Sequence, residues 1–150
     1  MVFRGNFEHT LDAKHRLTIP AKFRSALAAG VVLAVSPETQ TGSAKSIAIW
    51  PTAAFEQYTT EVLAGHNPIS PRARELRRLL FNNSHDTELD AANRVMIPPS
   101  LLRYAGLDRE VVVTGSGECL EVWDRGAHAA YNDDVLSRFP EIAASVGDTA

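Results

Sequence analysis

Short apolar stretches alternate with polar turns along the chain, and the same order of stretches occurs twice. In each half, two short alternating stretches flank a polar turn and lead into a proline and a short helical segment. A β-branched hairpin and a longer helix follow. Residues 31–35 and 110–114 are the clearest strand runs, and residues 52–64 and 124–136 have helical spacing. The pattern predicts a mainly β protein of the α+β class with flanking helices.

The two halves also resemble each other residue by residue. Residues 11–20 read LDAKHRLTIP and residues 89–98 read LDAANRVMIP, so six of the ten positions are identical at a constant offset of 78. Further along, IAIW ending at Trp50 matches LEVW ending at Trp123. Such self-similarity indicates an internal duplication. Because a unit of about 55 residues buries little core alone and leaves strand edges exposed, the two copies are expected to pair within one subunit.

Helix and turn signals refine this prediction. Short helices are expected over residues 21–30 and 99–106, since each follows a proline suited to a first helical turn and ends at a glycine. The predicted hairpin turns and helix N-caps are residues 38–43, residues 115–117, Thr52 and Asp124.

Between the copies, a helix is predicted over residues 71–81 with a leucine stripe and four arginines around it: Arg72, Arg74, Arg77 and Arg78. These arginines fit subunit contacts, general attraction of DNA, or simply a solvated face. The last dozen residues show no clear pattern. The predicted domains are 5–52 and 83–126 for the two repeats, 53–82 for a helical connector, and 127–150 for a C-terminal helix and tail.

Charge initially argues against a nucleic-acid partner. The net charge is −3 with a pI near 5.9, which excludes a polybasic binder. However, residues 1–35 carry a net +3 while residues 106–150 carry −6. This asymmetry permits an anion-binding face on the N-terminal repeat, and the alternative is that the uneven charge marks only solvated faces. No apolar run is long enough for a membrane span or typical of a signal peptide, and the single Cys119 excludes an internal disulfide framework. We therefore expect a cytoplasmic protein.

The turn at residues 12–16 is the most informative site. Lys14 and Arg16 would lie near its tip, and Asp12 could hold the loop by accepting hydrogen bonds from backbone N–H groups. His15, like Asn93 in the second copy, would occupy a left-handed position. Two cations on a stiff loop suit phosphate or guanine contacts. The alternative is a solvated hairpin in which Arg16 only pairs with Asp12, an interaction worth about 0–1 kcal/mol.

With these residues assembled, the chain resembles the MraZ family of bacterial transcriptional regulators, which are built from two SpoVT-AbrB domains. The resemblance rests on DAKHRLTIPAKFR after the first strand, the second Asp-x-x-x-Arg copy, Phe3-Arg4-Gly5 and the Glu121–Asp124 segment, and it covers nearly the whole chain. It implies a tandem AbrB-like, swapped-hairpin β-barrel and a ring-shaped homo-oligomer. It further implies binding of tandem direct DNA repeats upstream of its own division and cell-wall gene cluster, as a nucleoid-associated repressor.

The family's DNA-contacting motif falls on Asp12, Lys14, Arg16, Asp90 and Arg94. The tip residue His15 could add a pH-sensitive contact to DNA or only occupy the turn. Ala92 replaces the cation of the motif in the second copy, and His15 and Asn93 stand where the family usually has glycine. We expect Arg16 to read base edges, Lys14 to hold the DNA backbone and Asp12 to order the loop. Arg94 would be a weaker second contact or a structural member of the barrel.

Other functional classes fit less well. The five histidines lack metal-ligand spacing, Cys119 has no partner cysteine, and residues 115–117 match neither a phosphate loop nor a nucleophile elbow. We therefore expect no enzymatic activity, cofactor, metal or small-molecule substrate. The remaining alternative is an AbrB-fold protein-interaction module of the antitoxin type, although such chains usually have one repeat and a long disordered tail.

Overall fold

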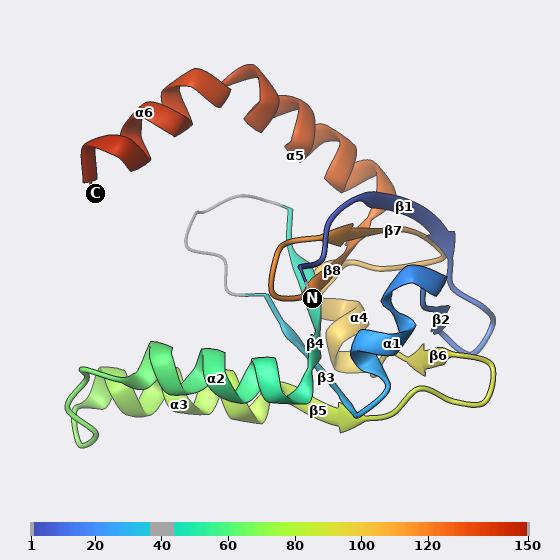
Figure 1. Ribbon diagram of the computed structural model, residues 1–150, viewed down its shortest axis with the longest axis horizontal. Helices are drawn as coiled ribbons and strands as arrows, with labels where there is room; N and C mark the ends of the chain where they lie inside the picture. The colour runs from blue at the N-terminus through green and yellow to red at the C-terminus, as the bar shows by residue number, and fades with distance from the viewer. Residues whose placement is uncertain (1, 37–43, 150) are drawn as a thin grey trace.

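The computed structural model describes residues 2–36 and 44–149 as antiparallel strands with flanking helices (Figure 1). The strands are β1 (Asn6–Thr10), β2 (Arg16–Thr18), β3 (Val31–Val35), β4 (Ser46–Pro51), β5 (Ser84–Thr87), β6 (Arg94–Met96), β7 (Glu110–Gly115) and β8 (Leu120–Asp124). The helices are the 3-10 turn η1 (Ala21–Phe23), α1 (Arg24–Leu27), α2 (Thr52–Leu63), α3 (Pro71–Asn82), α4 (Pro99–Ala105), α5 (Arg125–Ser137) and α6 (Phe139–Thr149).

The two repeats exchange strands. Six strands form one antiparallel sheet in the order β1-β7-β8-β4-β3-β5, and β2 and β6 form a separate two-stranded ribbon. The first strand of each repeat therefore pairs with the third strand of the other, as β1 does with β7 and β5 with β3. The central pair, β4 with β8, also joins the two repeats. Neither repeat can complete its sheet without the other.

One hydrophobic core holds these strands together. Its members come from both repeats and include Leu17 and Ile19 beside the first turn and Val95 and Ile97 beside the second, all at most 1% exposed. Because Leu17 and Val95 face this core, their neighbours on β2 and β6 must face outward. One face of the ribbon therefore packs on the core, and the opposite face is exposed to solvent.

The longer helices of the two repeats dock in the same way. Trp50 at the end of β4 stacks on Tyr58 of α2 with ring centroids 4.7 Å apart, and Trp123 at the end of β8 stacks on Tyr131 of α5 at 5.2 Å. In both repeats the tyrosine follows the tryptophan by eight residues. The duplication therefore extends into the helices as a matched Trp–Tyr stack that the sequence pattern alone did not reveal.

Most predicted elements are confirmed, with instructive differences. Asp124 caps α5 by accepting a 2.9 Å hydrogen bond from Ala127 N, but Thr52 is not a cap: the N-cap residue of α2 is Pro51, and it makes no side-chain cap bond. The hairpin at residues 115–117 is confirmed, whereas the turn at 38–43 lies outside the described residues. The first short helix is only η1 followed by α1, ending before the predicted Gly30.

Two larger expectations need correction or restriction. The C-terminal residues form a regular helix, α6, because Phe139, Ile142 and Val146 recur at helical spacing, a signal the sequence reading overlooked. The mainly antiparallel, mixed α and β fold is confirmed, but no hydrogen-bonded pairing joins edge strands β1 and β5 within the described residues. A closed barrel is therefore not found. No helix in the described ranges is long and apolar enough to cross a membrane.

Candidate nucleic-acid interface

The ribbon of β2 and β6 lies at one end of the molecule (Figure 1). Arg16 pairs with Met96 and Thr18 pairs with Arg94 across the ribbon, on either side of the buried Leu17–Val95 pair. Side chains alternate between faces along a strand, so the four outer residues share the exposed face. A two-stranded antiparallel ribbon has the right width to enter the major groove of DNA.

The loop before β2 is held by one carboxylate. Asp12 Oδ1 accepts hydrogen bonds from the backbone N–H groups of Lys14 and Arg16, both at 2.9 Å. Its Oδ2 atom accepts from Arg16 Nε at 2.6 Å, a charge-assisted pair. The backbone also closes the turn, since His15 N donates to Asp12 O at 2.9 Å. Asp12 thus orders the loop, as predicted, and also orients the arginine.

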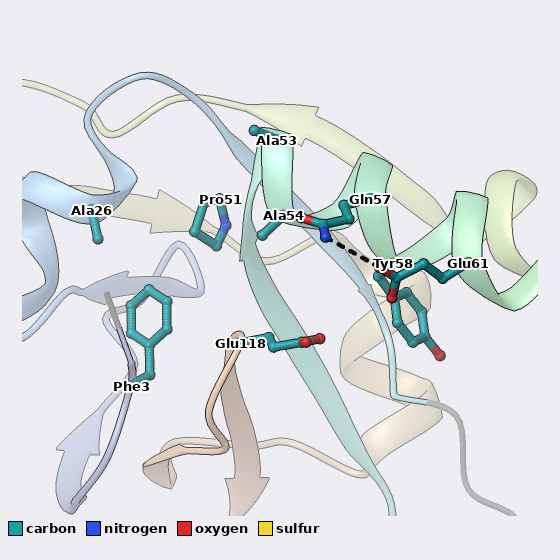
Figure 2. A pocket seen from close by; sticks show the side chains of 9 residues that line it. All are labelled: Phe3, Ala26, Pro51, Ala53, Ala54, Gln57, Tyr58, Glu61 and Glu118. Carbon is teal, nitrogen blue, oxygen red and sulfur yellow. Dashed lines mark hydrogen bonds between the residues drawn. The ribbon is translucent and has the colours of Figure 1, made fainter.

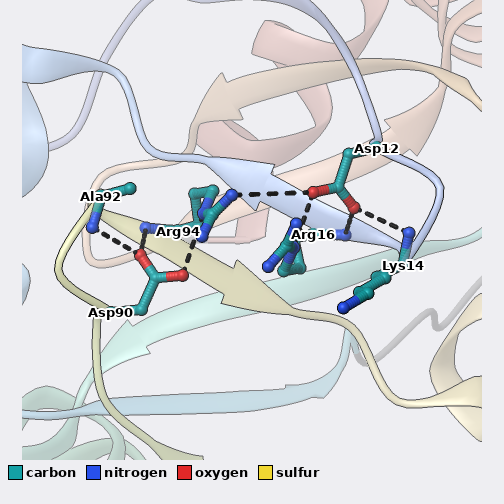
Figure 3. A network of polar contacts seen from close by, with 6 residues as sticks. All are labelled: Asp12, Lys14, Arg16, Asp90, Ala92 and Arg94. Atoms are coloured by element: carbon teal, nitrogen blue, oxygen red, sulfur yellow. Dashed lines mark hydrogen bonds and ion pairs between the residues drawn. The ribbon is translucent and has the colours of Figure 1, made fainter.

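The loop before β6 repeats this arrangement almost atom for atom. Asp90 Oδ1 accepts from Ala92 N and Arg94 N at 2.9 Å each, and Asp90 Oδ2 accepts from Arg94 Nε at 2.9 Å (Figure 3). Asn93 N donates to Asp90 O at 2.9 Å. The scaffold of the loop is therefore conserved between the repeats, while Ala92 leaves the second loop without the lysine of the first.

The tips of both loops adopt the left-handed backbone expected from the sequence. His15 has φ of 58° and Asn93 has φ of 60°. Both residue types tolerate this region better than most side chains, although glycine does so without steric cost. Both tips therefore hold the left-handed conformation with a residue other than glycine.

The two loops are also joined to each other, which the sequence did not suggest. Ile97 N donates to the carbonyl of His15 at 3.0 Å, and Ile19 N donates to the carbonyl of Asn93 at 2.9 Å. Arg94 Nη1 lies 3.9 Å from Asp12 Oδ2, across the ribbon (Figure 3). Each tip carbonyl therefore fixes the strand that follows the other turn, so the two loops form one rigid unit.

The electrostatics agree with this geometry. The backbone hydrogen bond from Arg16 is the main cause that lowers the pKa of Asp12, and the Arg16 guanidinium adds to it. The backbone hydrogen bond from Arg94 likewise lowers the pKa of Asp90. Both carboxylates are therefore ionised at neutral pH, where they can hold their arginines in place.

The cations remain available to a ligand despite these contacts. Arg16 bonds Asp12 through Nε, and within the described residues its two terminal nitrogens have no partner. Terminal guanidinium nitrogens can form a bidentate pair with guanine N7 and O6. The Lys14 ammonium has no ion-pair partner in the described part of the chain. The surface pair between Arg16 and Asp12 therefore does form. It orients the Arg16 side chain and leaves the terminal nitrogens for a ligand.

The structure brings all six predicted site residues together on the two loops and their strands: Asp12, Lys14, His15, Arg16, Asp90 and Arg94. Sequence reasoning missed Thr18 and Met96, which complete the outer face. The alternation of exposed and apolar positions around Leu17 and Val95 is the signal that could have identified them.

Other features of the surface lie away from this face. The four arginines of α3 are exposed on a helical hairpin that projects from the other end of the molecule (Figure 1). A cavity of about 400 Å³ lies beside α2 and is lined by Phe3, Tyr58, Glu61 and Glu118, among others (Figure 2). Its two glutamates would repel a phosphate. No group of three or more His, Cys, Asp or Glu side chains suited to a metal occurs in the described ranges.

Comparison with known proteins agrees with the duplicated architecture. The family model described as "MraZ protein, putative antitoxin-like" matches residues 2–79 and again residues 80–145. The chain is 36% identical to the transcriptional regulator MraZ of Mycoplasmoides gallisepticum over 147 residues, which cover 98% of this chain and 99% of that protein. It is also 36% identical to the protein of the same name from Herpetosiphon aurantiacus, over 97% of this chain and 96% of that one. For Mycolicibacterium gilvum the identity is 38% over 88% of each chain. The chain therefore belongs to the MraZ family, whose members at this level of identity are named transcriptional regulators.

Proposed function

We propose that this protein represses transcription by binding tandem direct repeats of double-stranded DNA, with the β2–β6 ribbon in the major groove. The observation that carries the proposal is the pair of coupled Asp–Arg loops, which hold two arginines side by side on one exposed face (Figure 3). A carboxylate that fixes the plane of a guanidinium reduces the conformational freedom lost when that arginine binds a base.

Each residue of the first loop has a distinct part in this proposal. Arg16 reads a guanine edge through its terminal nitrogens, Lys14 contacts a phosphate as a point charge, and Asp12 holds the loop. In the second repeat, Arg94 makes a weaker contact because no lysine accompanies it. One face with so few cations gives modest, salt-dependent affinity for a single site.

Assembly into a ring would supply the missing affinity, because several ribbons on one ring engage successive repeats at high effective concentration. Two apolar surfaces support assembly. One is a groove of about 620 Å³ between α5 and α6, bordered by Leu136, Phe139 and Val146, which are 58–66% exposed. The other is a groove of about 320 Å³ lined by Trp50 and by leucines of α3. Exposed apolar grooves of this kind mark interaction surfaces.

The placement of these grooves favours a head-to-tail arrangement. They are two different surfaces, so their contact would be heterologous, and a heterologous contact forms a ring when its rotation closes but does not form a two-fold dimer. The four arginines of α3 would face acids such as Asp133 and Glu141 of a neighbouring copy, which assigns the arginines to subunit contacts. Such a ring leaves the ribbons, at the other end of the molecule, open to DNA (Figure 1).

The finer fold assignment belongs to the same proposal. We infer that the six-stranded sheet and the ribbon together correspond to the swapped-hairpin AbrB-like barrel, since both contribute side chains to one core. The target DNA is the region upstream of its own division and cell-wall gene cluster. The protein would then be associated with the nucleoid in the cytoplasm.

The test is a gel shift with DNA from upstream of the gene, using Arg16→Ala and Arg16→Lys. Arg16→Ala is expected to lose specific binding, by roughly 100-fold, while light scattering shows an unchanged assembly. Arg16→Lys keeps the charge but not the bidentate geometry, so it should bind specific and unrelated DNA about equally. Footprinting of the wild-type protein should show protection at regular direct repeats.

Two outcomes would contradict the proposal. Undiminished specific binding by Arg16→Ala would remove the ribbon as the reading element. Absence of protection upstream of the gene, together with a co-purifying protein partner, would favour the antitoxin-type interaction module instead.

A further inference from the structure

Met96 is an apolar residue in an unusual place. It is 62% exposed, at one end of the outer face of the ribbon, directly opposite Arg16. Its neighbours Val95 and Ile97 are each 1% exposed and belong to the core. Packing therefore explains the apolar character of both neighbours but not that of Met96.

The residue at the position of Met96 differs between the two otherwise equivalent strands of the ribbon. Arg16 and Arg94 are equivalent in the two repeats, and so are Leu17 and Val95, but the residue equivalent to Met96 is Thr18. A threonine can donate or accept hydrogen bonds with any base, whereas a thioether side chain offers mainly apolar contact. The two ends of the ribbon thus have different chemistry on the same backbone.

We propose that Met96 is a specificity-determining residue that contacts the 5-methyl group of a thymine, next to the base read by Arg16. This inference rests on the proposed DNA-binding function. The thymine methyl is the one apolar group that the base edges present in the major groove. A flexible, polarizable side chain can cover it without a demanding geometry.

Distances across the ribbon allow Met96 and Arg16 to contact bases that lie close together in the DNA. Directly opposed residues of an antiparallel pair have Cβ atoms about 5 Å apart, and successive bases of one strand are about 3.4 Å apart along the helix axis. Met96 and Arg16 therefore reach positions within one or two base pairs of each other. Since Thr18 replaces Met96 at the other end, the ribbon reads a site with a direction, as direct repeats require.

The experiment is a double comparison of protein and DNA. The segment upstream of the gene is synthesised with thymidine or with deoxyuridine, which lacks only the methyl group. Wild type, Met96→Thr and Thr18→Ala are titrated against both. Met96→Thr makes the two ends of the ribbon alike, and thermal unfolding confirms that each variant is folded.

Wild type is expected to bind the deoxyuridine DNA about fivefold more weakly than the thymidine DNA. Met96→Thr should bind the thymidine DNA more weakly than wild type does, by up to about fivefold, and should distinguish the two DNAs less than wild type does, because its single methyl group is held closer to the backbone. Thr18→Ala should keep the wild-type ratio between them. Changes in DNA flexibility caused by deoxyuridine affect all three proteins equally and cancel in the comparison.

Equal binding of both DNAs by wild type, or the same ratio for wild type and Met96→Thr, would overturn the inference while leaving DNA binding through Arg16 intact. Failure of wild type to prefer the upstream DNA over a shuffled sequence of equal length would overturn the proposed function, and the inference with it.

Discussion

The loops at residues 12–16 and 90–94 share their backbone hydrogen bonds, their aspartate–arginine pair and their left-handed tip. They differ in the side chains that point away from this scaffold: Lys14 against Ala92, and Thr18 against Met96 just beyond. The aspartate and arginine that maintain each turn have stayed alike after duplication, whereas the outward-facing pairs Lys14/Ala92 and Thr18/Met96 have diverged.

The coupling between the loops explains this division. Each tip carbonyl accepts a hydrogen bond from an isoleucine of the other repeat, so a distorted tip would disturb both strands of the ribbon. The side chains of Lys14, Ala92 and Met96 take no part in these bonds. Their chemistry can therefore change without cost to the fold, and we expect the two loops to contribute equally to stability but unequally to binding.

The largest expected difference between the two loops comes from removing the carboxylate of each loop in turn. Asp12→Ala and Asp90→Ala delete the same three hydrogen bonds, so both should lower the melting temperature by a similar amount. Asp12→Ala should weaken specific DNA binding by about 10- to 100-fold because it releases Arg16, and Asp90→Ala by only about two- to fivefold. Thermal unfolding and gel shifts on both variants measure the two effects. Equal losses of affinity would mean that both loops read the DNA equally.

A smaller effect comes from moving the lysine. Lys14→Ala should reduce the slope of log affinity against log salt by about 0.9 per subunit bound, because one phosphate contact is lost. Ala92→Lys should increase this slope by a similar amount and strengthen binding by about three- to tenfold. Ala92→Met is the uncharged control of similar length. An unchanged slope for Ala92→Lys would place the second loop beyond reach of the phosphates.

The smallest effect concerns the strained tips. His15→Gly should increase the free energy of unfolding by about 0.5 kcal/mol, because glycine adopts a positive φ without steric cost but is more flexible when unfolded. Asn93→Gly should change it less, since asparagine is better suited to this conformation. Urea denaturation resolves the difference, and a larger gain for Asn93→Gly would reverse the proposed order of strain.

Much of the fold could be predicted from the sequence. The duplication, most strands and helices, and the six loop residues follow from local signals: apolar alternation, a proline before each short helix, and aspartate, asparagine or histidine at turn positions. Where local signals failed, a local reason is visible. Thr52 looked like an N-cap, but Pro51 already occupies that position, and the apolar stripe of α6 was overlooked.

The sequence by itself therefore determined the order of the elements, the scaffold of each turn and the type of chemistry at its tip. Only the tertiary structure decided that the repeats exchange their first strands, that each tip carbonyl bonds the opposite repeat, and that Arg16 lies opposite Met96. The physical reason is that turn and helix signals act within a few residues. Strand pairing between the repeats instead joins segments that are 50 to 108 residues apart, from Ala34 with Ser84 to Asn6 with Thr114. It does so through backbone groups, which are the same in every residue except proline.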